Sequence, residues 1–316
     1  MKAILSNFQE TELPKPAPGG RDLLVKVEAI SVNPVDYKQR KQAAQPKVLG
    51  WDAAGTVEAV GPEVTLFKPG DAVYYAGDVT RPGCNSEFHL VDERVVGRMP
   101  KKLDFAQAAA IPLTGITAWE SFFDRLHVKP GKSVLIIGGA GGVGSIGIQL
   151  AKLAGLRVIA TASRPETVAW VKALGADQVV NHRQNLPSQV GAPVDYIANF
   201  SGELDAYWDT MAELIAPQGA MVAIVGNTKP LALDAVRQKS VTFAWELMFT
   251  RPRYKTADMI EQHRLLNQVA EWLDEGKLRG TLRETLSPIS AANLRTAHEK
   301  VESGTMIGKL VLKGWQ

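Results

Sequence analysis

The sequence predicts an α/β protein that combines a doubly wound parallel sheet with a second, mostly-β and barrel-like domain. Strands alternate with helical patterns across residues 113–247, and short β segments separated by Pro and Gly fill residues 1–112. The chain has 316 residues, more than the roughly 250 to 300 that one hydrophobic core usually supports. We therefore expect two domains, one over 113–247 and one formed by 1–112 together with 248–316.

The mostly-β domain is predicted from segments rich in β-branched and aromatic residues. These segments are Leu23–Ile30, Gly55–Val60, Asp71–Tyr75 and Glu87–Val91. Turn-forming pairs of Gly and Pro separate them, as typical antiparallel strands require. The apolar segment Ile307–Leu312 near the end of the chain is expected to rejoin this domain and make it discontinuous.

The parallel sheet is predicted from six apolar segments between helical patterns. The segments are Val134–Ile137, Arg157–Thr161, Gln178–Val180, Val194–Phe200, Ala220–Val225 and Val241–Trp245. Helices are expected over 166–174 and 204–215, and a long amphipathic helix over 256–275 follows this domain. Six strands in alternation with helices indicate a doubly wound arrangement.

The stretch Val134–Lys152 passes from an apolar strand through five glycines into a helix. Its Gly-x-Gly-x-x-Gly spacing lies between strand and helix, as a dinucleotide-binding motif requires. Glycines let the backbone approach phosphates, and the N–H groups at the helix start attract an anion. We predict a dinucleotide site here, with a plain glycine-rich turn as the alternative. The predicted contacts are Gly139, Gly141, Gly142, Val143 and Gly144.

The residues after the second strand indicate which nicotinamide cofactor binds. In NAD-binding proteins of this fold, an acidic residue about 20 positions beyond the glycines holds the ribose hydroxyls. No Asp or Glu stands between Gly144 and Pro165. Arg164 can hold a ribose 2′-phosphate through a charge-assisted hydrogen bond, and Ser163 can donate another. We therefore predict NADP(H); the alternative for Arg164 is a solvated residue near a helix start.

Composition excludes several other classes of function. Hydrophobic residues make up 45% of the chain and charged residues 22%, as in an ordinary globular protein. The net charge of +3 is too small to imply nucleic acid or an anionic membrane as a partner. The first residues lack a signal-peptide core and no apolar run approaches ~18 residues, so a cytoplasmic protein is expected. The single cysteine, Cys84, is interpreted as an incidental loop thiol.

Several motifs resemble those of the medium-chain dehydrogenase/reductase superfamily, specifically its zinc-lacking quinone oxidoreductase branch. Besides the glycine stretch, they are Val32–Asp36, Gly50–Val57, Lys68–Asp71, Pro112–Ala118 and Gly308–Leu312. They cover nearly the whole chain and resemble most closely a bacterial subgroup called zinc-type alcohol dehydrogenase-like. The resemblance implies a Rossmann nucleotide domain, a GroES-like catalytic domain and a homodimer, with Val241–Trp245 as the expected contact.

The positions that hold catalytic zinc in this superfamily carry other residues here. The superfamily's zinc ligands are a Cys three residues before an Asp, a His in Gly-His-Glu, and a further Cys or carboxylate. By resemblance, Asn33 stands at the position of the Cys and Trp51 at that of the His. Since an amide and an indole cannot replace a thiolate and an imidazole, we expect no metal. The five histidines are scattered without metal-ligand spacing.

Without a Lewis acid, alcohol oxidation loses its main source of charge stabilisation, so an easily reduced hydride acceptor is expected. Quinones and α,β-unsaturated carbonyls qualify because conjugation delocalises the incoming electron pair. The sequence therefore predicts an NADPH-dependent quinone or enone oxidoreductase. A zinc-free reductase of aldehydes or ketones and a non-enzymatic NADPH-binding sensor are the alternatives.

The resemblance implies a substrate cleft between the domains, lined by Asn33, Tyr37, Trp51 and Asp52, with residues 248–253 closing over it. Asn33 is expected to contact substrate or the nicotinamide ribose, or else to shape a turn. Tyr37 is expected to donate a proton, or else to be packed, and Asp52 is equally interpreted as structural. For Phe200, core packing is the alternative to a cofactor contact. The further cofactor contacts implied are Thr114, Thr117, Phe200, Ser201, Val225 and Gly226.

Overall fold

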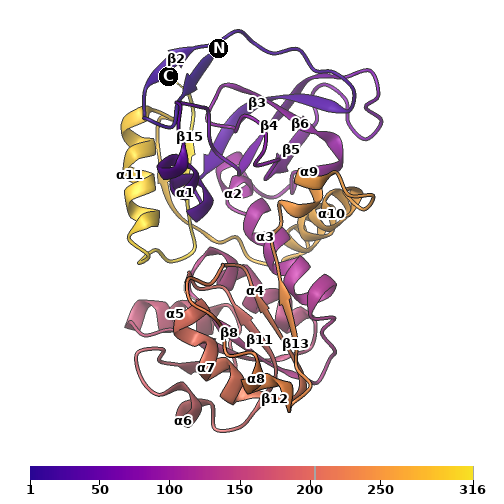
Figure 1. The fold of residues 1–316 in the computed structure, drawn as a ribbon. Helices are drawn as coiled ribbons and strands as arrows, with labels where there is room; N and C mark the ends of the chain where they lie inside the picture. The colour runs from indigo at the N-terminus through magenta and orange to yellow at the C-terminus, as the bar shows by residue number, and fades with distance from the viewer. Residues whose placement is uncertain (203, 316) are drawn as a thin grey trace. The chain divides into compact units, whose positions relative to one another are not determined.

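The computed structural model describes residues 1–202 and 204–315 and divides into two compact units (Figure 1). The first unit comprises Met1–Ile116 and Phe249–Gln316, and the second comprises Thr117–Met248. Both ends of the chain belong to the first unit, which is therefore discontinuous. Across the described residues, no helix combines the length and the apolar character that crossing a membrane demands.

A seven-stranded sheet forms the centre of the first unit, in the order β14-β15-β3-β4-β5-β7, with β6 paired to β3. The long strand β3 pairs with β4 on one edge and with β6 and then β15 on the other. Every pair except the parallel β14–β15 is antiparallel, which confirms the expected mostly antiparallel sheet. The strands are β3 (Asp22–Ser31), β4 (Ala53–Val60), β5 (Ala72–Tyr75), β6 (Phe88–Asp92), β7 (Val96–Arg98), β14 (Leu282–Leu286) and β15 (Lys309–Lys313).

Helices of different lengths and a strand pair complete the first unit. The long helix α10 buries Leu265, Leu266, Val269 and Leu273, the apolar face expected from the sequence, but begins at Ile260 rather than at Thr256. The Thr256 hydroxyl donates instead to Asp258 at 2.5 Å and holds a turn before the helix. The elements are β1 (Lys2–Ile4), β2 (Glu10–Glu12), α1 (Pro34–Gln42), η1 (Glu93–Val95), α2 (Phe105–Ala109), α9 (Thr250–Tyr254), α10 (Ile260–Asp274) and α11 (Ala291–Glu302).

The second unit is built on a six-stranded parallel sheet in the order β10-β9-β8-β11-β12-β13. The order of strands reverses between β8 and β11, so the predicted doubly wound sheet is confirmed. The homodimer contact expected at the edge strand β13 stays a prediction. The strands are β8 (Ser133–Ile137), β9 (Arg157–Thr161), β10 (Gln178–Val180), β11 (Val194–Asn199), β12 (Ile215–Ala223) and β13 (Thr242–Trp245).

Helices surround this sheet along the chain. α3 (Pro112–Trp119) begins in the first unit and ends in the second, where a π-helix, η2 (Glu120–Arg125), continues it. The remaining helices are α4 (Gly142–Leu153), α5 (Pro165–Ala173), α6 (Leu186–Val190), α7 (Leu204–Leu214) and α8 (Asp234–Arg237). The core on one side of this sheet contains buried aliphatic residues of β8, β9, β11 and β12 together with Trp208 and Met211 of α7.

Candidate active site

The glycine loop of the second unit turns sharply between β8 and α4. Gly138 has a φ of +83°, a conformation open to glycine, and the loop then folds back over the first turn of α4. A Cβ on Gly144 would lie 2.2 Å from the Gly138 carbonyl oxygen and 2.7 Å from the Gly139 Cα. Only a residue without a side chain fits there. The N–H groups in the first turn of α4 therefore lie at the end of β8. No carbonyl within the helix accepts from these N–H groups, so they can bind an anion.

The end of β9 is fastened to this loop. The Thr161 hydroxyl accepts a hydrogen bond from the Gly138 N–H at 2.9 Å. Beyond Thr161, the chain runs through Ser163 to Arg164, the residue before the first turn of α5. The partly exposed Arg164 guanidinium is paired with Glu166 at 3.0 Å. A phosphate bound by Arg164 would therefore have to compete with this carboxylate, a contact that the sequence interpretation missed.

Phe200 and Ser201 follow β11 and lie against the glycine loop. A Cβ on Gly138 would come within 3.1 Å of the Phe200 carbonyl group and of the Ser201 nitrogen. The half-buried Phe200 ring meets Phe122 edge to face, with centroids 5.8 Å apart. This contact gives the core-packing alternative for Phe200 a physical basis. The Ser201 N–H donates to the Asn199 side chain at 2.9 Å, which fixes the turn after the strand.

The carboxyl ends of the parallel strands gather the predicted cofactor residues of the second unit. Segments that follow parallel strands leave the same edge of a sheet, where ligands of open α/β sheets bind. Val225 is half-buried and Gly226 exposed just beyond β12. The residues at this edge are Gly139, Gly141, Gly142, Val143, Gly144, Ser163, Arg164, Phe200, Ser201, Val225 and Gly226.

The two threonines of α3 are buried. The Thr114 hydroxyl, in the first unit, donates to the Ile111 carbonyl at 3.1 Å, as threonines in helices often do. Thr117, in the second unit, is 5% exposed. The hydroxyl of Thr114 therefore serves its own helix in this structure, and a cofactor contact from it stays a prediction.

A buried polar cluster occupies the first unit, and we call it the Asn33 network. It consists of Asn33, Asp36, Asp52 and Lys309, whose exposed fractions are at most 4%. Asn33 caps the start of α1, Asp36 lies in the first turn of that helix, Asp52 directly precedes β4 and Lys309 begins β15. Four charged or polar groups from three separate stretches of the chain thus meet inside one unit. Burial at this level is rare for such groups unless they are paired.

The Asn33 side chain is held at both ends of its amide. Its Nδ2 donates to Asp52 Oδ2 at 2.8 Å, and its Oδ1 accepts from the Lys309 ammonium. Lys309 Nζ also donates to the Val32 carbonyl at 3.1 Å and lies 3.2 Å from Asp52 Oδ2. The orientation of the amide follows from this chemistry, because only its oxygen can face an ammonium. Asn33 is therefore a bridge between a carboxylate and a cation.

Asp52 connects three parts of the first unit. Its Oδ1 accepts from the Leu113 N–H at 2.8 Å, and its Oδ2 faces Asn33 and Lys309. Burial raises the pKa of Asp52, while the Lys309 charge and the hydrogen bonds from Asn33 and Leu113 lower it. We describe Asp52 as ionised, since only the carboxylate accepts from all of these donors. These contacts favour the structural interpretation of Asp52.

Trp51 packs beside this network without a free polar group. Its indole Nε1 donates to the Asp78 carbonyl at 3.2 Å, and the side chain is 1% exposed. The ring meets Phe249 edge to face, with centroids 6.3 Å apart. Phe249 belongs to the segment 248–253 that was expected to close over the site, so one residue of this segment does pack on a predicted site residue.

Tyr37 lies outside the Asn33 network. It is half-buried on α1, and its ring faces the Lys41 ammonium at 5.8 Å. Burial and the Glu302 charge raise the pKa of Tyr37, while Lys41 lowers it. These neighbours belong to α1 and α11. A proton donor at Tyr37 stays a prediction, and the structure does not bring it together with Asn33 and Asp52.

Two members of the network, Asp36 and Lys309, were absent from the predicted site. A signal for Lys309 does exist in the sequence, because it stands directly before the apolar residues Leu310, Val311 and Leu312 of a strand. A lysine buried at the start of such a strand needs a partner, and here the partner is a carboxylate. Within 1–202 and 204–315, no group of three or more His, Cys, Asp or Glu is placed to hold a metal ion.

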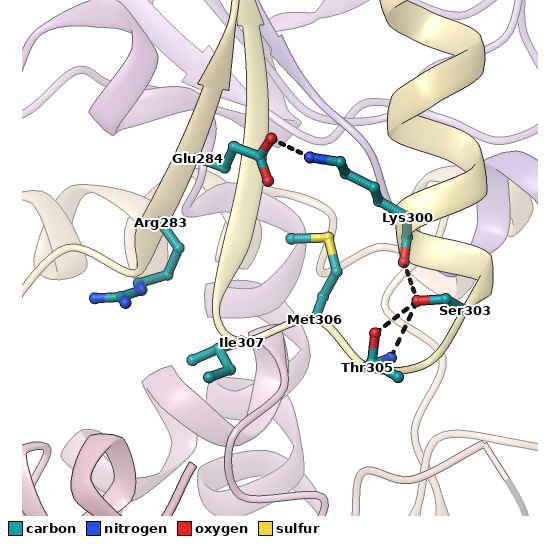
Figure 2. A pocket seen from close by; sticks show the side chains of 7 residues that line it. All are labelled: Arg283, Glu284, Lys300, Ser303, Thr305, Met306 and Ile307. Atoms are coloured by element: carbon teal, nitrogen blue, oxygen red, sulfur yellow. Dashed lines mark hydrogen bonds and ion pairs between the residues drawn. The ribbon is translucent and has the colours of Figure 1, made fainter. Parts of the chain in front are cut away.

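A pocket of about 340 Å³ lies elsewhere in the first unit, between β14, the end of α11 and the loop that follows (Figure 2). Glu284 and Lys300 form an ion pair at its wall, and the Ser303 hydroxyl donates to the Lys300 carbonyl at 2.7 Å. The residues that line this pocket include none that the sequence predicts to bind substrate or cofactor.

Two families of known proteins match the sequence. Residues 19–101 match the alcohol dehydrogenase GroES-like domain, and residues 174–312 match the zinc-binding dehydrogenases. The chain is 47% identical over 315 residues to the zinc-type alcohol dehydrogenase-like protein SACOL2177 of Staphylococcus aureus (strain COL), covering 96% of this chain and 94% of that protein. It is 29% identical over 324 residues to the quinone oxidoreductase of Pongo abelii, covering 96% and 92%.

Solved structures with the same fold include relatives of this chain. The crystal structure of a putative zinc-dependent alcohol dehydrogenase protein from Rhizobium etli CFN 42 is 52% identical, with a TM-score of 0.95 and coverage of 100% of this chain and 98% of that one. The mycobacterial protein Rv1454c, solved in complex with NADPH, is 27% identical, with a TM-score of 0.86 and coverage of 99% and 100%. These matches show that the chain belongs to the medium-chain dehydrogenase/reductase superfamily, as an oxidoreductase similar to the quinone oxidoreductases.

Proposed function

We propose that this protein is an NADPH-dependent oxidoreductase that transfers hydride to a quinone or an α,β-unsaturated carbonyl without zinc. The observation that carries the proposal is the Asn33 network, which puts an amide and an ammonium where zinc-dependent members of the superfamily are expected to hold a metal. The glycine loop and the carboxyl edge of the parallel sheet support the dinucleotide. NADPH in the solved relative supports the choice of a nicotinamide cofactor.

Donor chemistry supports the zinc-free part of the proposal. The Asn33 oxygen, the atom that an asparagine would offer to a metal, accepts from Lys309. The Trp51 nitrogen is a donor only, and it is used by the Asp78 carbonyl. A divalent cation would meet the Lys309 charge and would lack thiolate and imidazole ligands. The residues present therefore do not fit a zinc ion.

The remaining residues have roles that suit a conjugated acceptor. Bound NADPH supplies the hydride. The glycine loop would hold the phosphates of the cofactor on the N–H groups of α4, and Arg164 would hold a 2′-phosphate. In the first unit, Asn33 would orient the acceptor or the nicotinamide ribose, and Tyr37 would donate a proton. Conjugation in the acceptor spreads the incoming charge, so less polarisation by the protein is needed.

A panel of acceptors tests this function. We expect oxidation of NADPH with a naphthoquinone or an enone, slower oxidation of NADH, and little activity on an aliphatic aldehyde, as followed at 340 nm. Activity on the aldehyde alone would favour the zinc-free carbonyl reductase. Tight binding of NADPH with no turnover of any acceptor would favour the sensor and would reject the proposed enzyme.

The preference for NADPH should depend on Arg164. Replacing it in Arg164→Ala removes a charge-assisted hydrogen bond to the 2′-phosphate, so the KM for NADPH should rise about tenfold while that for NADH changes little. The partial exposure of Arg164 limits the effect through solvent screening. Glu166→Gln is the matched control, because it removes the competing carboxylate and should lower or preserve the KM for NADPH. Equal changes for both cofactors in Arg164→Ala would remove Arg164 from this role.

A further inference from the structure

The Asp36 carboxyl is buried with only one of its oxygens bound. Its Oδ2 accepts from the Asn33 N–H at 2.6 Å, which closes the first turn of α1. Its Oδ1 is buried and has no hydrogen-bond partner among the described residues. An ionised carboxylate offers about four acceptor sites, so one N–H satisfies it poorly. A neutral carboxyl group suits these surroundings better than a charged one.

The charges that face Asp36 do not balance a second carboxylate. Lys309 from β15 is the cation of the network, and Asp52 at the start of β4 already pairs with it at 3.2 Å. Cys84 lies close to both carboxyl groups, and burial raises the pKa of its thiol, so it stays neutral. Burial raises the pKa of Asp36 to about 7; Asp52 adds to the rise, and the Asn33 N–H, the Lys309 charge and, more weakly, the Trp51 backbone oppose it.

The other helix that packs on α1 supplies no counter-charge to Asp36. On α11, Glu302 pairs with Arg40 and Lys41, which lie at the far end of α1 from Asp36. His298, also on α11, is buried, and burial together with the Arg40 charge lowers its pKa to about 4. His298 is therefore neutral at physiological pH. The balance of the Asn33 network is set by Lys309, Asp52 and Asp36 alone among the groups named.

We propose that Asp36 is a positioning residue whose proton keeps the Asn33 network neutral and so holds the Asn33 amide in its working orientation. With the proton in place, one ammonium faces one carboxylate. Without it, the charge of one ammonium is set against two carboxylates, Asp52 in direct contact with Lys309 and Asp36 bound to the Asn33 N–H, so the network carries an unbalanced negative charge beside Asn33. The proposal rests on the proposed function in that Asn33 acts on the acceptor or the nicotinamide ribose.

Steady-state kinetics against pH test this role with Asp36→Asn. For the natural protein, kcat/KM for NADPH-dependent reduction of a naphthoquinone should fall above about pH 7 in a step of one proton. In Asp36→Asn, the amide oxygen still accepts from the Asn33 N–H and the group is neutral at every pH, so this fall should vanish. A fall that persists unchanged in the variant would overturn the proposal.

Asp104→Asn is the matched control. Asp104, like Asp36, belongs to a capping box at a helix start in the first unit: its carboxylate accepts from the Gln107 N–H at 2.7 Å at the start of α2, but its side chain is exposed. The control should leave the pH profile of the natural protein in place. If it removes the fall as Asp36→Asn does, loss of a helix cap explains both results and the role of the Asp36 proton is rejected.

Unfolding by urea tests whether Asp36 is protonated in the folded protein, without any measurement of enzyme activity. The folded protein keeps a proton on Asp36 that the unfolded chain loses above its ordinary pKa of 3.8, so stability falls between about pH 4 and about pH 7. The unfolding equilibrium constant of the natural protein should rise, relative to Asp36→Asn, by up to about tenfold per pH unit across this range. A ratio that does not change with pH would overturn the proposal. If the ratio of the two unfolding constants changes with pH but the protein reduces no acceptor, the proposed function is rejected and the proton on Asp36 is retained.

Discussion

Gly144→Ala should abolish tight binding of NADPH and destabilise the second unit. The new methyl group would lie 2.2 Å from the Gly138 carbonyl oxygen and 2.7 Å from the Gly139 Cα. Both neighbours are backbone atoms, so no side chain can move aside and the loop itself must shift. We expect a loss of on the order of 3 kcal/mol in the free energy of unfolding. Binding of NADPH, measured by fluorescence titration, should weaken by at least about a hundredfold.

Gly141→Ala is the matched control within the same loop. Gly141 has a φ of −71°, which alanine adopts freely, and its Cβ would lie 3.5 Å from the Gly138 oxygen, an ordinary contact. This change should cost about 0.5 kcal/mol in stability and, because the loop keeps its course, weaken NADPH binding far less than Gly144→Ala does. If both variants bind NADPH alike, the close approach of Gly144 to Gly138 does not shape the cofactor site.

The difference between these two glycines shows what the sequence could predict about the loop. Spacing alone places Gly139, Gly141 and Gly144 between a strand and a helix; in the structure Gly139 and Gly141 lie there, whereas Gly144 is already in the first turn of α4. Spacing does not reveal which glycine touches another part of the chain. Gly139 would bring a Cβ within 3.0 Å of Ala160 on the neighbouring strand β9, whereas Gly141 meets nothing closer than 3.5 Å. Such contacts depend on the course of the backbone, which a local pattern does not contain.

The fold class was predictable because the apolar side chains that face the core recur along the sequence with the spacing of the strands and helices that carry them. Six apolar segments gave six strands, and the alternation with helices gave their parallel order. Boundaries were less predictable. A helix was expected up to residue 215 and the next strand from Ala220, but β12 already begins at Ile215 and includes Pro217, Gln218 and Gly219. The chain passes through this segment with a positive φ at Gln218 and a shift of register against β11, irregularities that composition does not reveal.

The candidate site was predictable in part. Asn33 and Asp52 were expected in it and share a hydrogen bond at 2.8 Å. The cation that pairs with them, Lys309, is more than 250 positions away in the sequence. The apolar pattern after Lys309 predicts a buried strand, but it does not reveal which residues lie opposite that lysine. The pair Arg164–Glu166 was missed for a similar reason, since the two residues stand on either side of a helix start whose geometry decides whether they meet.

Lys309→Met should be among the most destabilising single changes in the first unit. Methionine keeps the length of the side chain but removes the ammonium. Asp52 then keeps a buried charge without its cation, and the Asn33 oxygen and the Val32 carbonyl lose a donor. Leaving one member of a buried ion pair uncompensated costs about 3 to 5 kcal/mol. Urea unfolding followed by circular dichroism measures this loss.

A second substitution separates loss of charge balance from loss of packing. The double variant Lys309→Met/Asp52→Asn removes both charges and should recover a large part of the stability, because no buried charge is left unpaired. Lys300→Met is the control, because it breaks a partly exposed ion pair instead of a buried one. Lys300 and Glu284 form this pair at the wall of the pocket in Figure 2, so the variant should lose no more than about 1 kcal/mol in the free energy of unfolding. If Lys309→Met costs no more than Lys300→Met, or if the double variant recovers nothing, charge balance does not hold the Asn33 network together.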